Sequence, residues 1–152
     1  LCITPGKKVF VVFIDLNILD HDGNLFDTAA LASILALMSA KIQKYTVTKD
    51  GQLKFKTGTI TLPLTNFPVE VTIAKIGDKL VVDPSLDEEA VIEAQITIAL
   101  GKDDEVCAVQ KSLTGTFSLD EVSTVLDIAT TKVKAMRENV LRGVGGWLDG
   151  KE

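Results

Sequence analysis

The side chains that most often carry chemistry are few in this chain, and their spacing assembles no catalytic set. His21 is the only histidine, with no cysteine or second histidine beside it, so we expect an ordinary turn residue and not a metal ligand. Ser118 has no histidine partner for nucleophilic chemistry. The acidic run Asp87-Glu88-Glu89 is typical of a solvated turn. The residues therefore predict no catalytic side chain, no cofactor and no metal site.

Two cysteines and two arginines indicate structural roles. Cys2 and Cys107 lack metal-ligand spacing, and one lies in an apolar stretch, so we expect buried free thiols in a reducing compartment. Arg137 and Arg142 fall in the last predicted helix, where we expect a favourable interaction with the helix dipole.

Composition limits the class of protein. A chain of 152 residues with 46% hydrophobic content can form one domain or two small lobes. The net charge of −5 argues against a protein whose whole surface grips a polyanion. The longest apolar run, Ala29 to Met38, is too short to span a bilayer, so we expect a soluble, cytoplasmic protein without membrane contact. Because it starts at Leu1, we expect the chain to be the later part of a longer one.

The first part of the chain predicts a strand, a turn and a helix. Val9 to Leu19 is rich in β-branched and aromatic residues and predicts a strand buried on both faces at its start. His21 to Asn24 has turn chemistry. Leu25 to Lys44 has the pattern of a helix, with Asp27 or Thr28 as its cap. Because its middle is apolar almost all round, we expect it to pack on several sides.

The second part predicts a mostly antiparallel sheet and a covering helix. Tyr45 to Leu64 is expected to be a connector with a marginal hairpin that turns at Lys49 to Gln52. The strand-like segments after it are 69–76, 80–82, 91–100 and 106–109. Ser118 to Glu121 is a capping box that begins a helix. Its expected apolar stripe is Val122, Leu126, Ala129, Val133, Met136 and Val140.

This order of elements predicts an α+β or α/β chain of two lobes. We expect residues 1–44 to complete a first lobe and 45–67 to connect it to a second lobe at 68–143. Residues 144–152 are expected to be a frayed tail, docked by Trp147.

The segment from Val12 to Asn24, together with the predicted helix after it, resembles the RNase PH family. Its sequence is Val-Phe-Ile-Asp-Leu-Asn-Ile-Leu-Asp-His-Asp-Gly-Asn. Active members of that family carry Asp-Gly-Gly-(Ser/Thr)-Arg at the helix start, where the resemblance implies binding of the phosphate that attacks RNA. Here Asp22 and Gly23 match, but Asn24, Leu25 and Phe26 replace the second glycine, the hydroxyl and the arginine. An apolar pair cannot hold phosphate, and Asp27 adds a repelling charge.

A second segment, Asp83 to Ile96, resembles the acidic part of the same family. The resemblance implies two carboxylates, six residues apart, that hold a metal or activate an oxygen. These positions fall on Glu89 and Gln95, and Gln95 cannot ionise. Val69 to Asp78, Gly115 to Ser118 and the final helix extend the resemblance over almost the whole chain.

Within this family, the chain most resembles the non-catalytic ring subunits of the archaeal exosome. This resemblance implies an α+β, RNase PH-type two-lobe fold, in which part of a lobe like ribosomal protein S5 domain 2 precedes an RNase PH C-terminal lobe with a mixed sheet. It further implies a hexameric ring with a catalytic paralogue, RNA-binding cap subunits and single-stranded RNA degraded 3′ to 5′ by phosphorolysis. The RNA-contacting arginines are expected in an earlier half, so none is assigned in this chain.

Two other functions remain open. One is a divergent phosphorolytic exoribonuclease in which Glu89, Asp87 and Glu93 replace the usual acids. The other is an unrelated RNA- or protein-binding module that uses the lysine-rich connector.

Charge is distributed unevenly along the chain. Between residues 41 and 60, five lysines (41, 44, 49, 54 and 56) oppose only Asp50, a balance of +4 that is typical of a solvated face or of contact with RNA or an acidic neighbour. From 83 to 105, eight acids (83, 87, 88, 89, 93, 103, 104 and 105) oppose Lys102, a balance of −7. Opposite patches of this kind can set subunit order. The apolar helix from Thr28 to Ala40 is expected to be covered by another chain or by a separately held first half.

Overall fold

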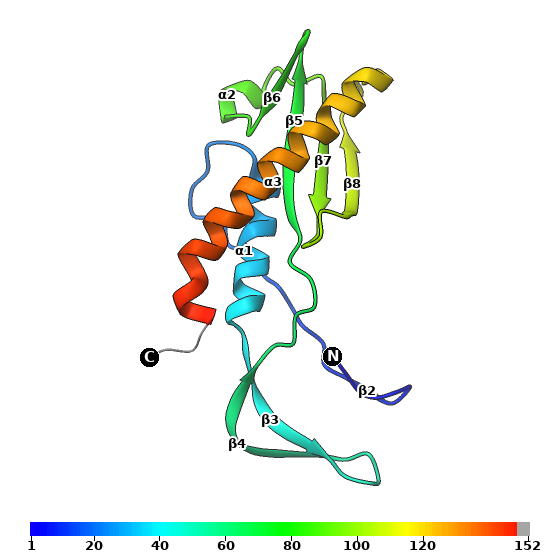
Figure 1. Cartoon of the computed structure of the whole chain (residues 1–152), viewed down its shortest axis with the longest axis vertical. Helices are drawn as coiled ribbons and strands as arrows, with labels where there is room; N and C mark the ends of the chain where they lie inside the picture. The colour runs from blue at the N-terminus through cyan, green and yellow to red at the C-terminus, as the bar shows by residue number, and fades with distance from the viewer. Residues whose placement is uncertain (149–152) are drawn as a thin grey trace.

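The computed structural model describes residues 1–148 and shows an elongated α+β chain (Figure 1). Three helices and eight strands follow one another in the described part of the chain. Their order is β1 (Cys2–Thr4), β2 (Lys8–Val9), α1 (Leu25–Ser39), β3 (Lys41–Val47), β4 (Leu53–Thr61), β5 (Val69–Ile76), β6 (Lys79–Val82), α2 (Leu86–Glu89), β7 (Ala94–Leu100), β8 (Val106–Ser112) and α3 (Leu119–Leu148).

A four-stranded sheet with the order β6-β5-β7-β8 holds the core. Every strand pair in residues 1–148 is antiparallel, so the sheet expected to be mixed contains no parallel pair in this part of the chain. Alternation along β5 and β7 turns one row of aliphatic side chains toward α3. That row and its helical partners form the main cluster of buried residues: Val69, Val71, Ile73, Ile96, Ile98, Leu100, Val125, Ala129 and Val133.

Helix α3 begins where its capping box predicts. The Glu121 N–H donates to Ser118 Oγ at 3.1 Å, and the Ser118 N–H donates to Glu121 Oε2 at 2.7 Å. The predicted apolar stripe is right for most of its members, but Leu126 is 38% exposed and Val125 is buried in its place. The stripe is therefore rotated slightly from the predicted one. Residues 144–148 continue α3 instead of fraying, the side chain of Trp147 lies outside the described part, and residues 149–152 are not described.

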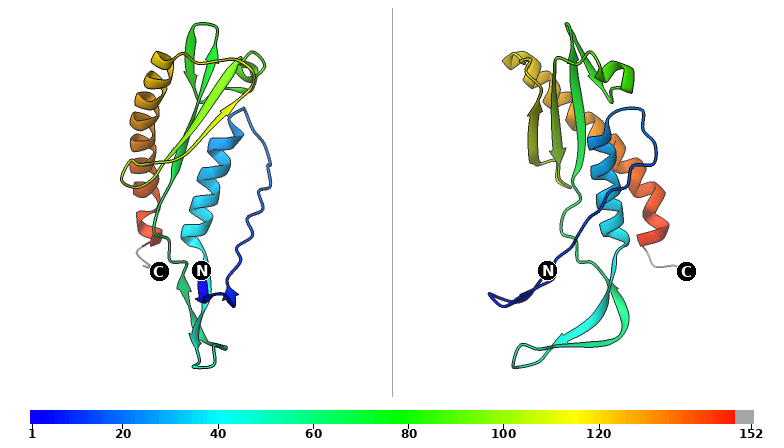
Figure 2. Two further views of the ribbon diagram at one scale, coloured as in Figure 1. Left: turned by 90° about the vertical axis from the view of Figure 1, so that its right-hand side faces the viewer. Right: turned by 180° about the vertical axis from the view of Figure 1, so that it is seen from behind.

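Helix α1 packs against β5 on the face opposite α3, so that β5 lies between the two helices (Figure 2). It ends at Ser39, five residues before the predicted end, because Ala40 adopts an extended conformation and Lys41 already pairs with Thr61. Of its fifteen residues only Asp27 and Ile34 are buried. The expectation of a helix packed on several sides is wrong for this chain, and much apolar surface of α1 stays accessible.

The connector expected to contain a marginal hairpin is instead a long one, because β3 and β4 pair from Lys41–Thr61 to Val47–Leu53. It projects from one end of the molecule, beside the small β1–β2 ribbon (Figure 1). The two pieces touch where the Phe10 and Tyr45 rings lie 5.3 Å apart between centroids.

The strand predicted from Val9 to Leu19 is absent. Strand β2 ends at Val9, and residues 10–22 form no regular element and pair with no strand in the described chain. Phe13 is 84% and Leu19 is 97% exposed. A strand needs a partner to bond its backbone, and none lies beside this segment, so the pattern alone could not make one.

Candidate functional site

The turn before α1 is held tightly against the segment before α2. Gly23 has a φ of +94°, and a Cβ added to it would lie 2.4 Å from the Pro84 carbonyl oxygen and 2.7 Å from the Ser85 carbonyl carbon. Only glycine fits this approach without a shift of the backbone. Asn24 follows at φ 46° and ψ 47°, a left-handed conformation that asparagine tolerates better than most residues.

This approach joins the two segments of the family resemblance in a single pocket. A cavity of about 310 Å³ is lined by Asn24, Leu25, Phe26, Thr72, Pro84, Glu89, Ile92, Gln95 and Leu113. The replaced phosphate-binding positions (24, 25 and 26) and the two acidic positions (89 and 95) are therefore brought together, although they lie more than 60 residues apart. The two sets of positions that align with the family's active site therefore lie in one place in the structure.

The start of α1 is occupied by carboxylates of the chain itself. The Asn24 N–H donates to Glu89 Oε1 at 2.8 Å. The Asn24 side-chain amide donates to Asp83 Oδ1 at 2.8 Å and to Asp27 Oδ2 at 2.9 Å. No lysine, arginine or histidine is among the residues that line the pocket. An incoming phosphate would meet Glu89 and the apolar Leu25 and Phe26 on the pocket wall, with Asp27 and Asp83 bound to Asn24 behind it, so the pocket has the wrong chemistry for an anion.

Asp27 has a different role from the predicted ones. It does not cap α1, and neither does Thr28, because the helix starts from Asn24 without a side-chain cap. Asp27 is only 7% exposed and accepts from the Thr72 N–H at 2.8 Å and from Thr72 Oγ1 at 2.6 Å. Burial raises the pKa of this carboxyl above its ordinary value of 3.8, although the bonds from Thr72 and Asn24 oppose that shift. Asp27 thus joins α1 to β5.

The acidic run near residue 88 is a short helix and not a loose turn. The Ser85 N–H donates to Glu88 Oε2 at 2.8 Å, and the Glu88 N–H donates to Ser85 Oγ at 3.4 Å, which is the same capping box as in α3. The Ser-x-x-Glu spacing that predicted the start of α3 also occurs here, so the sequence contained the signal for α2. Asp87 is exposed, and Glu93 accepts from the Gly77 N–H at 3.0 Å.

The remaining candidate residues fall outside the pocket. His21 Nδ1 accepts from the Gly23 N–H at 3.4 Å, which agrees with an ordinary turn residue. Cys2 and Cys107 are free and exposed, so the expected buried thiols are wrong; Cys107 lies on the edge strand β8, beyond the cover of α3. Within the described part of the chain, no group of three His, Cys, Asp or Glu side chains is placed to hold a metal ion. The helices described there also include none that is long and apolar enough to cross a membrane.

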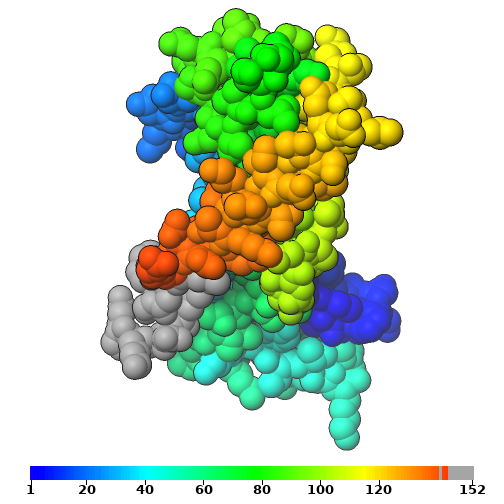
Figure 3. All heavy atoms as spheres, turned by 45° about the horizontal axis from the view of Figure 1, so that its top comes forward, coloured from blue at the N-terminus to red at the C-terminus, as the bar shows by residue number. Residues whose placement is uncertain are grey.

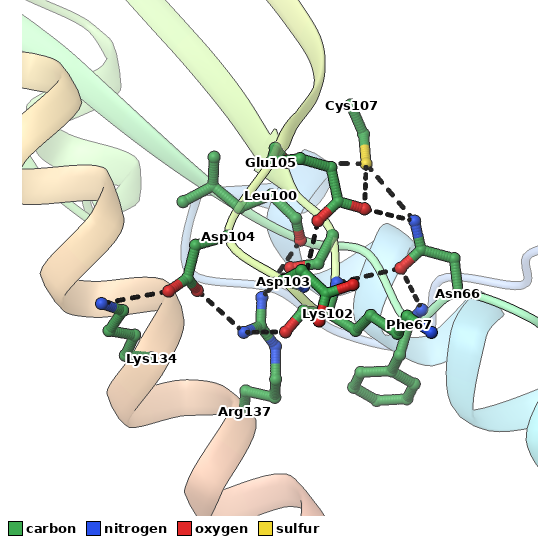
Figure 4. Close-up of polar contacts among 11 residues, drawn as sticks. Asn66, Phe67, Leu100, Lys102, Asp103, Asp104, Glu105, Cys107, Lys134 and Arg137 are labelled. Atoms are coloured by element: carbon green, nitrogen blue, oxygen red, sulfur yellow. Dashed lines mark hydrogen bonds and ion pairs between the residues drawn. The ribbon is translucent and has the colours of Figure 1, made fainter.

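Arg137 has a contact that helix-dipole reasoning did not predict. Its guanidinium donates to the carbonyl oxygens of Leu100, Gly101 and Lys102 and to Asp104 Oδ1 (Figure 4). These are the residues of the turn between β7 and β8. The arginine therefore fastens that turn to α3, while Arg142 is exposed.

The predicted acidic patch separates into two groups in space. Asp104 forms ion pairs with Lys134 and Arg137, at 3.0 Å each, and these neighbours lower its pKa. Glu105 accepts from the Asn66 side chain at 2.9 Å. The acids around α2 lie at the other end of the sheet (Figure 1). The patch of −7 counted along the sequence is therefore not one surface, whereas the lysines of residues 41–60 do lie on one hairpin.

An α+β chain whose four-stranded antiparallel sheet packs against α1 and α3, with a pocket at the start of α1, defines the class of protein, and comparison with known proteins supplies the family. Models of the 3′ exoribonuclease family match this chain twice, domain 1 at residues 1–43 and domain 2 at residues 66–132. An exosome complex component Rrp42 of Thermococcus onnurineus is 47% identical over 146 residues, which are 95% of this chain and 54% of that protein.

Solved structures agree with this result. An archaeal exosome core superposes with a TM-score of 0.68 at 36% identity, over 80% of this chain and 46% of that one. An Archaeoglobus fulgidus exosome with RNA bound to the active site gives a TM-score of 0.67 at 35% identity, over 80% of this chain and 45% of that one. The chain belongs to the 3′ exoribonuclease, or RNase PH, family, as its sequence predicted. It spans about half the length of the curated relatives that it matches.

Proposed function

We propose that this chain is part of a non-catalytic subunit of an exosome ring, which pairs with a catalytic paralogue and supports 3′-to-5′ phosphorolysis of single-stranded RNA in the cytoplasm. The observation that carries this proposal is the start of α1, where Glu89 accepts from the backbone N–H of Asn24, Asp83 and Asp27 accept from its side-chain amide, and no basic side chain lines the pocket. A phosphorolytic centre has to concentrate phosphate beside RNA, which is already an anion. With its carboxylates and without a basic lining residue, this pocket disfavours phosphate.

The exposed apolar surface supports a subunit that is covered by more polypeptide. Eight large apolar side chains between Val9 and Leu19 are exposed, and α1 buries only two residues. Soluble monomers rarely expose a continuous apolar surface of this kind. We propose that a ring neighbour or further parts of the same protein cover it, and that a cap subunit binds RNA on the ring.

Reconstitution tests the proposal. The full-length protein that contains this chain is purified alone, and in complex with a paralogue that carries Asp-Gly-Gly-Ser-Arg, and both are given labelled single-stranded RNA with and without inorganic phosphate. The complex should shorten the RNA only when phosphate is present, with release of nucleoside diphosphates. The subunit alone should leave the RNA intact. Phosphate-dependent shortening by the subunit alone would falsify the non-catalytic assignment.

A divergent active enzyme is the second candidate, because Glu89 does line the pocket. Glu89→Gln separates the two. Glutamine keeps an oxygen that accepts from the Asn24 N–H, so the fold is preserved while the ionisable group is removed. An active enzyme would lose rate by orders of magnitude, and a structural subunit would leave the rate of the complex unchanged. Asp87→Asn, at an exposed neighbouring acid, is the matched control.

A further inference from the structure

The β3–β4 hairpin concentrates positive charge in a chain that is acidic as a whole. With the adjoining β1–β2 ribbon it carries seven lysines (7, 8, 41, 44, 49, 54 and 56), all exposed, against one acid, Asp50. That is a local balance of +6, so the remainder of the chain carries −11 of the total of −5. Among residues 1–148, none of these seven ammonium groups forms an ion pair. The charge at this end of the molecule is therefore uncompensated.

The register of the hairpin separates its two faces. The pairs Tyr45–Phe55 and Val47–Leu53 lie on one face, and the pair Thr46–Lys54 lies on the other. Lys44 directly precedes Tyr45 and Lys56 directly follows Phe55, so alternation turns both toward the face of Thr46 and Lys54. The register shifts between Gln43 and Tyr45, which leaves Lys44 and Lys56 without a partner in the ladder. We call Lys44, Lys54 and Lys56 the lysine face.

Phe10 contacts the face of Tyr45, whereas the side chains of Lys44, Lys54 and Lys56 are exposed in the described part of the chain. Phe10 packs on Tyr45, with ring centroids 5.3 Å apart. Thr4 lies beside the turn of the hairpin, since a Cβ on Gly51 would be 3.8 Å from its side chain. In the space-filling view the N-terminal residues lie next to the hairpin at the same end of the molecule (Figure 3). Beside Lys44, Gly58 has no side chain to cover the lysine stem.

We propose that the lysine face binds the phosphate backbone of single-stranded RNA, at a site separate from the pocket. Like charges gathered on one face of a strand pair destabilise it, and a polyanion removes that penalty. Thr46, which pairs with Lys54 on this face, is exposed and supplies a hydroxyl donor of the kind that binds phosphate oxygens. The inference rests on the proposed function, because it takes RNA as the substrate that the assembly handles. It adds an RNA contact outside the pocket at the start of α1.

The size of the effect follows from counterion release. Each phosphate contact with a single strand contributes about −0.7 to the slope of log affinity against log salt. Removing three lysines should therefore reduce the slope by about 2. At 1 M salt the contribution of these contacts to affinity is taken as zero, and 0.1 M salt is one decade lower. The variant should therefore bind roughly 100-fold more weakly than the wild type at 0.1 M salt.

The test measures binding of fluorescein-labelled single-stranded oligouridine to the full chain by anisotropy over a salt series. The variant is Lys44→Gln, Lys54→Gln, Lys56→Gln. The matched control is Lys79→Gln, Lys111→Gln, Lys132→Gln, which removes the same charge from exposed positions outside the hairpin. The wild type and the control should bind with nearly equal slopes, and the hairpin variant should show the reduced affinity and slope. Replacement of the same three lysines by arginine should restore binding.

Three results would overturn the proposal: no salt-dependent binding by the wild type, an unchanged hairpin variant, or an equal loss in the control. Tighter binding of polyaspartate than of oligouridine at equal charge concentration would also overturn it, by assigning the lysine face to acidic proteins. The reconstitution assay is independent of these outcomes. If the hairpin variant binds oligouridine as tightly as the wild type, the site is rejected. If the complex that contains this variant still degrades RNA by phosphorolysis, the proposed function stands.

Discussion

Gly23→Ala tests the contact that brings the two halves of the pocket together. Gly23 and Gly58 both have a φ of +94°, so alanine meets the same unfavourable backbone conformation at either position, at a cost of about 1–2 kcal/mol. Alanine also restricts the unfolded chain, which offsets about 0.4–1 kcal/mol in both cases. Gly58→Ala should therefore destabilise the protein by about 1 kcal/mol.

The surroundings of the two glycines differ. A Cβ on Gly58 would meet only the flexible side chain of Lys44, at 3.6 Å or more. On Gly23 it would lie 2.4 Å from the carbonyl oxygen of Pro84, a residue that is fully buried. Either the turn or residues 84–86 must move, and a misfit of this kind costs about 1–3 kcal/mol more. Gly23→Ala should therefore destabilise the protein by about 2–4 kcal/mol.

Urea unfolding of the two variants at neutral pH measures the difference directly. With a slope of about 1–3 kcal/mol per M, a difference of about 2 kcal/mol separates the midpoints by roughly 1 M. Equal midpoints for Gly23→Ala and Gly58→Ala would refute the reasoning, because they would show that the turn is free to move away from Pro84. A pocket held by this contact should also lose the protection of the Asn24 amide from hydrogen exchange in Gly23→Ala.

Two further variants test single contacts. Burial raises the pKa of Asp27 above 3.8, so folding favours its protonated form, and the free energy of unfolding should fall as pH rises from 3.8 through the raised pKa. Asp27→Asn should flatten this fall when stability is measured by urea unfolding over that pH range. The part of the fall that remains should come from Glu70, whose pKa is also raised by burial. Parallel curves for wild type and variant would reject this account. Arg137→Gln should cost about 2–4 kcal/mol, because it leaves several carbonyls of the β7–β8 turn without their charged donor, whereas Arg142→Gln, at an exposed site, should stay within about 0.5 kcal/mol. Thermal unfolding that ranks the two arginine variants equally would reject the role of Arg137.

The elements that the sequence predicted well are those whose signals are local. A capping box at Ser118 and an apolar stripe predicted α3, and alternating residues bounded by turns predicted β5 through β8. The error within α3, Leu126 for Val125, comes from two neighbouring residues that both fit a helical period. Which of them is buried depends on the angle at which the helix crosses the sheet, and the helix pattern alone does not contain that angle.

What the sequence could not predict depends on contacts between distant residues. Val9 to Leu19 has the composition of a strand, but a strand forms only where a partner bonds its backbone, and the described chain has none beside it. Asp27 resembled a cap and is instead bound to Thr72, 45 residues later. Arg137 resembled a dipole partner and is instead bound to a turn 33 to 37 residues earlier. Each error assigned a local partner to a side chain whose real partner is remote.

The pocket shows how the replaced residues work together. Leu25 and Phe26 remove the donors that a phosphate would need, but the carboxylates of Asp27, Asp83 and Glu89 do more than repel an anion, because they take over the backbone and side chain of Asn24. The groups that fill the start of α1 therefore also hold α1 against β5 and α2. Under the proposed function, the place where active relatives are expected to bind phosphate is a packing contact in this chain. The hydrogen bonds from Asn24 to Glu89 and Asp83 then contribute to the stability of the subunit.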